Sequence, residues 1–144
     1  MFADFLKRLT APAPEPLAET DARLALTALL VRVARSDNDY SAAERSRIQS
    51  IIAARYGLDD TDRDDLLARA EELETEAPDT VRFTRAIKDC VAYDDRLAVI
   101  EALWQVVLAD GTRAKEEDAL LRLVANLLGI TDMDSAQARK RVEG

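Results

Sequence analysis

The sequence predicts a single all-α domain, and three observations carry this prediction. Only four glycines and four prolines interrupt a chain of 144 residues that is rich in Ala, Leu, Arg, Glu and Asp. Apolar residues recur at spacings of three and four along most of the chain, which is the period of a helix with one buried face. No segment shows the sustained alternation of a half-buried strand, so we predict no strands. The 48% of hydrophobic residues suffices for a real core.

Helical stripes follow one another from about residue 17 to the end, and we expect about seven helices there. The second predicted helix ends at Gly57 and the sixth at Gly129, because glycine is common just after the last residue of a helix. Pro78 separates the third helix from the fourth. In chain order the stripes are Leu26, Leu29, Leu30 and Val33; Ile48, Ile51, Ile52 and Tyr56; Leu66, Leu67, Ala70 and Leu73; Phe83, Ile87, Cys90 and Val91; Leu97, Ile100, Trp104, Val107 and Leu108; Leu120, Leu121, Val124, Leu127 and Leu128; and a last helix from Asp132 to Val142.

A short amphipathic segment precedes this domain. Residues 2–9 place Phe2, Phe5 and Leu6 on one side of a predicted helix, and the proline-rich stretch 11–16 predicts a stiff, extended linker. We therefore divide the chain into residues 1–16, the segment with its linker, and residues 17–144, the helical domain. We expect the segment to dock on the domain's own surface; an exposed apolar patch there would instead favour attachment to a partner or a membrane.

The chain also repeats itself weakly. Residues 30–37 (LVRVARSD) correspond to residues 103–110 (LWQVVLAD), and each stretch is followed by a Glu seven residues after its Asp. Each copy then continues into a helix that ends at a Gly followed by an apolar residue. A unit of helix, acidic turn and helix therefore occurs twice, which predicts two similar helix-turn-helix halves. Packed about a pseudo-twofold axis, the halves would bring their acidic turns near each other.

Charge and composition exclude several functions. The net charge of −8 disfavours nucleic-acid binding, because an acidic surface repels phosphates. The absence of histidine removes Ser-His and Cys-His catalysis, and with a single cysteine it leaves no nitrogen and sulfur ligands for zinc. We see neither a targeting signal nor an apolar run near the ~18 residues of a membrane span. We therefore expect a cytoplasmic, non-enzymatic protein with no evident small-molecule substrate.

The first acidic turn, residues 36–44 (SDNDYSAAE), has two interpretations. In the first, Ser41 is the N-cap of the next helix and Glu44 completes a capping box, while Asp37 and Asp39 stabilise the turn. In the second, the oxygens of Asp37, Asp39 and Glu44 hold Ca²⁺ or Mg²⁺. The spacing is not that of an EF-hand, because Glu44 is the eighth residue counted from Asp37 and not the twelfth.

The second turn favours the cation interpretation modestly. Asp110 and Glu117 keep the same spacing, but Ala114 stands where Ser41 stands in the first copy. The capping box is therefore lost while the Asp-to-Glu spacing survives, and capping alone does not require that. Thr112 stands where the first copy has its second Asp, so the second turn has fewer candidate ligands.

These motifs resemble the TerB family, the tellurite-resistance protein B domain. The resemblance rests on residues 33–44, on residues 83–85 (FTR), and on residues 103–111 followed by Glu117, and it covers roughly residues 20–142. It implies an all-helical domain of two similar halves. It also implies a divalent cation at the acidic positions, Asp37, Asp39 and Glu44 in one turn and Asp110 and Glu117 in the other. The chain departs from the family's pattern at Asn38, where Gly is common, and at Thr112.

The resemblance implies association with stress-response or membrane-linked proteins instead of catalysis. The function expected from the sequence is therefore an interaction module whose acidic turns bind a cation. Two alternatives stay open: a structural helical adaptor without metal, and a hydrolase that uses carboxylates and a metal. The partner and the oligomeric state do not follow from the sequence.

Overall fold

The protein is all-helical in the computed structural model, which describes residues 3–9, 19–35, 40–77, 79–107 and 115–143. The described residues form eight α-helices and no strand, as the sequence predicts, and none of these helices is long and apolar enough to cross a membrane. The helices are α1 (Ala3–Leu9), α2 (Glu19–Ala34), α3 (Ala42–Tyr56), α4 (Asp60–Glu76), α5 (Thr80–Cys90), α6 (Tyr93–Val107), α7 (Lys115–Leu127) and α8 (Asp132–Glu143).

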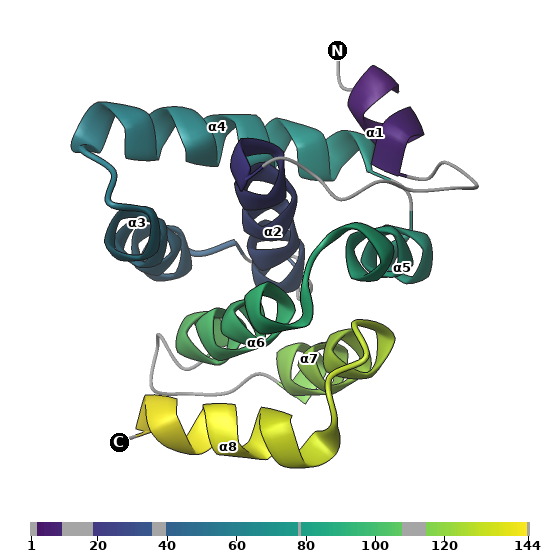
Figure 1. The fold of residues 1–144 in the computed structure, drawn as a ribbon. Helices are drawn as coiled ribbons and strands as arrows, with labels where there is room; N and C mark the ends of the chain where they lie inside the picture. The colour runs from purple at the N-terminus through teal and green to yellow at the C-terminus, as the bar shows by residue number, and fades with distance from the viewer. Residues whose placement is uncertain (1–2, 10–18, 36–39, 78, 108–114, 144) are drawn as a thin grey trace.

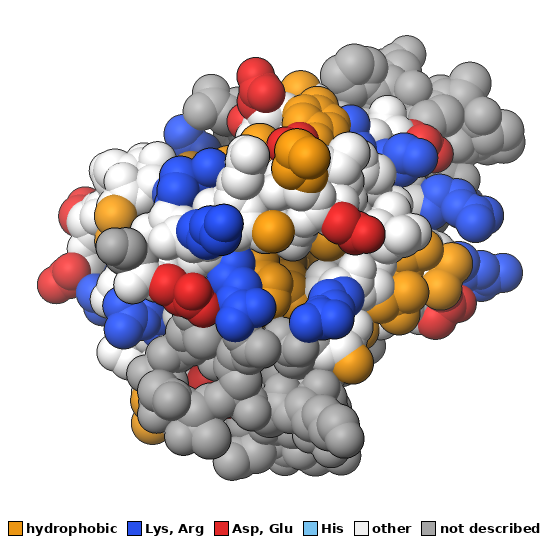
Figure 2. Space-filling view, turned by 90° about the horizontal axis from the view of Figure 1, so that it is seen from below, with side chains coloured by type: hydrophobic (Ala, Val, Ile, Leu, Met, Phe, Trp, Pro, Cys, Tyr) orange, Lys and Arg blue, Asp and Glu red, His pale blue; other side chains and the backbone are white. Residues whose placement is uncertain are grey.

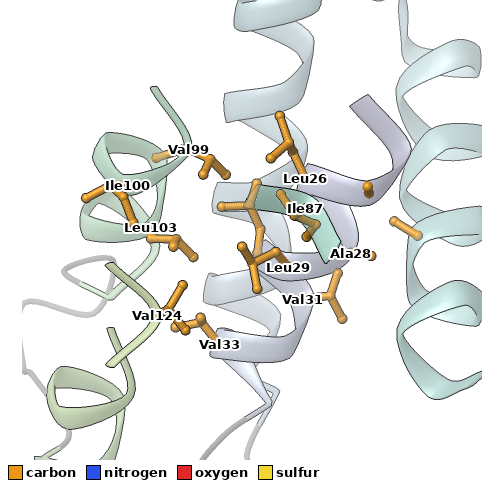
Figure 3. Close-up of a cluster of buried hydrophobic side chains, with 14 of the residues drawn as sticks. Leu26, Ala28, Leu29, Val31, Val33, Ile87, Val99, Ile100, Leu103 and Val124 are labelled. Carbon is orange, nitrogen blue, oxygen red and sulfur yellow. The ribbon is translucent and has the colours of Figure 1, made fainter. Parts of the chain in front are cut away.

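Helix α2 lies in the middle of the molecule, with α4 across one side and α6 on the other (Figure 1). Almost every residue from Leu24 to Ala34 is buried, which is expected of a helix that is apolar around its whole circumference. Figure 3 shows Leu29 and Val33 directed toward Leu103 and Val124 of α6 and α7, while Val31 lies on the opposite side of α2. Because each fully buried aliphatic side chain contributes about 1.5–3 kcal/mol, α2 is the main source of core stability.

The repeat predicted from the sequence extends further in the structure than predicted. Helix α2 packs against α3 and α4, and α6 packs against α7 and α8 in the same order. Contacts of α2 with α6 and α7, and of α3 with α6, join the halves as a pseudo-twofold arrangement requires. The repeated unit is thus three helices long, and α5 connects the copies. The proximity of the acidic turns stays a prediction, because residues 36–39 and 108–114 lie outside the described part.

Helices α3 and α7 end in the same way, at a glycine in the left-handed conformation. The φ angles are 63° at Gly57 and 74° at Gly129. The next amide in each copy, that of Leu58 or Ile130, donates to a carbonyl of the helix's last turn at 3.1 and 2.9 Å. This is the Schellman ending, in which glycine avoids the steric penalty of positive φ. Both Gly positions were correctly predicted as helix ends.

The helices that follow these glycines also begin alike. Asp59 is the N-cap of α4 and its Oδ1 accepts from the Asp62 amide at 2.8 Å. Thr131 does the same before α8, accepting from the Asp134 amide at 3.1 Å. Asp60 and Asp62 lie in the first turn of α4, where negative charge is favourable.

The N-terminal helix docks on the rest of the protein. Helix α1 contacts α5, Phe5 is 7% exposed as part of the core, and Leu6 packs against it. An exposed apolar patch, which would have favoured a membrane or partner role for this segment, is therefore not formed by Phe5. Phe2 and the linker at residues 11–16 lie outside the described residues.

The surface around α8 carries mixed charge. Seen from the side that α8 forms in Figure 1, Lys and Arg side chains gather across the middle of the face, with acidic groups between them (Figure 2). On α8 itself, Arg139 pairs with Glu143 at 2.8 Å and Arg141 with Glu101 of α6 at 3.2 Å.

Candidate functional site

The structure describes one of the five predicted cation ligands in full. Glu44 is the last residue of the first acidic turn and lies in the first turn of α3. Asp37, Asp39 and Asp110 lie outside the described residues. Glu117 lies in α7, but its side chain is outside the description as well. Among the described side chains, no group of three or more acidic or cysteine residues is placed to hold a metal ion.

Glu44 and Ser41 form the predicted capping box. The Ser41 Oγ accepts from the Glu44 amide at 3.0 Å, and the Glu44 Oε1 accepts from the Ser41 amide at 3.3 Å and from the Ser41 hydroxyl at 3.1 Å. Glu44 is only 3% exposed, which is rare for a carboxylate. Its side chain therefore closes the start of α3 and also lies inside the protein beside the acidic turn.

Replacing Ser41 by alanine is expected to lower the free energy of unfolding by about 1 kcal/mol, within the ~0.5–2 kcal/mol range of N-cap losses. The variant removes one acceptor for the Glu44 amide and one donor to its carboxylate, and it leaves every acidic side chain in place. Urea denaturation of the variant and the wild-type chain measures the difference. An equal free energy of unfolding for the two proteins would show that the capping box does not stabilise the native state.

Helix α4 forms ion pairs with residues on both sides of residues 36–39, and these two pairs are called the clamp below. Arg35, the last described residue before the turn, pairs with Glu74 at 3.1 Å. Arg45, in the first turn of α3, donates from Nε and Nη2 to both carboxylate oxygens of Glu71, at 3.2 and 3.3 Å. Such two-bond pairs fix geometry as well as charge. The chain is therefore held on either side of residues 36–39.

Tyr40 lies near residues of both ion pairs, namely Arg35, Arg45 and Glu71. Its ring lies under the guanidinium of Arg35, 5.1 Å from centroid to Cζ. Burial, together with the Glu71 carboxylate beside it, raises the pKa of Tyr40 above the usual range, so the phenol stays protonated. Sequence reasoning did not identify this clamp. The available signals were the arginines that flank the acidic turn and the Glu71–Glu74 spacing on α4, which places both carboxylates on one helix face.

Cys90 belongs to the fourth apolar stripe of the sequence, and it is buried in the structure as that stripe predicts. The residue is buried at the end of α5, and burial raises the pKa of its thiol. Trp104 is buried in α6, with its indole N–H 3.4 Å from the Ser135 hydroxyl of α8. Neither side chain is part of the acidic site.

Comparison with known proteins adds one finding. The family model described as Tellurite resistance protein TerB matches residues 23–140, which run from α2 to the last turns of α8. No curated protein and no solved structure matches the chain.

Proposed function

Since the chain belongs to the TerB family, we propose that it is a non-enzymatic interaction module of this tellurite-resistance family and that its first acidic turn binds a divalent cation. Asp37, Asp39 and Glu44 would hold the ion, and Asp110 and Glu117 would form a poorer second site. The partners would be other proteins in the cytoplasm, including membrane-associated complexes. The bound ion would neutralise repelling carboxylates and stiffen the junction between α2 and α3, so that a partner reads one fixed surface.

The burial of Glu44 carries this proposal. A carboxylate that is 3% exposed has lost most of its hydration, and nearby positive charge lowers the cost of that loss. A cation held by the turn would bring positive charge to Glu44 from the loop itself. The donors are carboxylates, which suit a hard ion such as Ca²⁺ or Mg²⁺.

The repeated spacing gives independent support. The second copy keeps the Asp-to-Glu spacing without the serine of the capping box, and capping alone does not require that spacing. The sequence also contains no histidine to serve as a general base, and this supports an interaction module over a hydrolase.

Calcium is expected to raise the melting temperature of the wild-type chain and not that of Asp37→Asn/Asp39→Asn. A ligand at ten times its dissociation constant adds about 1.4 kcal/mol, which corresponds to roughly 3–6 °C for a domain of this size. Asparagine has the same size and shape as aspartate and also stabilises turns, but the double substitution removes two negative charges. Differential scanning calorimetry with CaCl₂ or EDTA measures the shift.

The matched control is Asp62→Asn/Asp65→Asn, which removes two charges from exposed positions of α4. It should keep the full calcium shift, as should Ser41→Ala after its lower starting stability is taken into account. An equal shift in both double variants would assign the effect to general screening of an acidic protein and would contradict the proposed site.

A further inference from the structure

A cavity of about 480 Å³ opens between α2, α3 and α6, with the end of α5 as its fourth wall. Its interior is apolar, because the buried side chains of Leu30, Ile52 and Val99 face it from three helices. The space exists because α6 presents alanines one turn apart, Ala98 and Ala102, where larger side chains would fill it. The volume lies within the ~300–1,000 Å³ that small-molecule sites occupy.

The mouth of this cavity is polar and carries net positive charge. Arg23 of α2 and Arg55 of α3 line it together with a single carboxylate, that of Asp95. The guanidinium of Arg23 lies over the ring of Tyr56, 4.8 Å from its centroid. The pKa of the Tyr56 phenol is raised, mainly by burial. The positive charges of Arg55 and Arg23 act to lower this pKa and the negative charge of Asp95 acts to raise it, so all three charges act at the phenol. Two cations and one anion at the mouth contrast with the net charge of −8 of the whole chain.

We propose that this cavity binds a small amphipathic anion, with its apolar body against α2 and α6 and its carboxylate at Arg55, Arg23 and the Tyr56 hydroxyl. A small number of polar groups at one end of an apolar cavity is enough to orient a ligand, because they bind its polar head group. The donors here are guanidinium and phenol groups, which pair with a carboxylate. None of the residues that line the cavity belongs to the acidic turns, so this proposal does not rest on cation binding.

Isothermal titration calorimetry with sodium decanoate tests the site on the full chain. Saturable binding of one decanoate per chain is expected. Decylammonium, which has the same number of carbon atoms and the opposite charge, should bind at least tenfold more weakly. Arg55→Gln should weaken decanoate binding by about tenfold or more, because it removes a charge-assisted pair. The control Arg69→Gln makes the same change at an exposed position of α4 and should leave the affinity unchanged.

Filling the cavity gives a second readout. Ala98→Leu should abolish decanoate binding while circular dichroism shows an unchanged helix content. Should this variant not fold, the Arg55→Gln and Arg69→Gln comparison decides the question, since both side chains are exposed. The proposal is overturned if decanoate gives no saturable heat, if decylammonium binds equally well, or if the two arginine variants behave alike.

Discussion

Replacing Leu29 by alanine is expected to lower the free energy of unfolding by about 2–5 kcal/mol, the range measured for leucine-to-alanine changes in cores. Leu29 has no exposed surface and lies on α2, the helix that contacts α3, α4, α5, α6 and α7. Its side chain is directed toward Leu103 of α6, so truncation opens a cavity between helices of both halves (Figure 3). Urea denaturation followed by circular dichroism measures the loss.

Leu123→Ala is the matched control for this prediction. Leu123 lies on α7 and is 47% exposed, so the same three carbon atoms are removed largely from contact with water. We expect a change below about 1 kcal/mol, as for surface substitutions. Similar losses at the two positions would show that α2 is not the centre of the core.

Gly129→Ala is expected to destabilise the protein by about 2–3 kcal/mol, and more than Gly57→Ala. Both glycines have positive φ, where a side chain costs about 1–2 kcal/mol. At Gly129 a Cβ would also lie 3.1 Å from Lys88 Cε and 3.2 Å from Arg96 Nη1, whereas at Gly57 nothing lies within 4 Å. Arg96 cannot move freely, because its guanidinium donates to the carbonyls of Val91 and Leu128 at the ends of α5 and α7.

Thermal unfolding of both glycine variants, with Lys88→Ala as a second background, separates the two costs. In that background the excess loss at Gly129 should shrink, while the loss at Gly57 should not change. An equal cost at the two glycines in the wild-type background would show that crowding by Lys88 and Arg96 does not matter.

Much of the fold could be predicted because it depends on local signals. The helical period, the glycine helix ends and the Ser41 capping box each depend on residues that are close together in the sequence. The structure confirms each of them. The correspondence of α4 with α8, as the third helix of each repeat, was not predicted, because α4 buries Leu67, Ala70 and Leu73 whereas α8 buries Ser135 and Ala138. The two helices share a position in the fold but no apolar pattern.

The surroundings of the candidate site were less predictable. The pairs that clamp the first turn join residues 26 and 39 positions apart, in a chain with 48 charged side chains. Many other pairings are equally compatible with such a composition. The cavity likewise depends on which helices face one another, and the spacing of alanines on α6 does not reveal this by itself.

The affinity of the first acidic turn for calcium is the central claim, and isothermal titration calorimetry tests it most directly. We predict saturable binding of Ca²⁺ to the wild-type chain at millimolar concentration or below, lost in Asp37→Asn/Asp39→Asn and retained in Asp62→Asn/Asp65→Asn. The absence of binding heat from the wild-type chain with both Ca²⁺ and Mg²⁺ at millimolar concentration, at two temperatures, would contradict the claim.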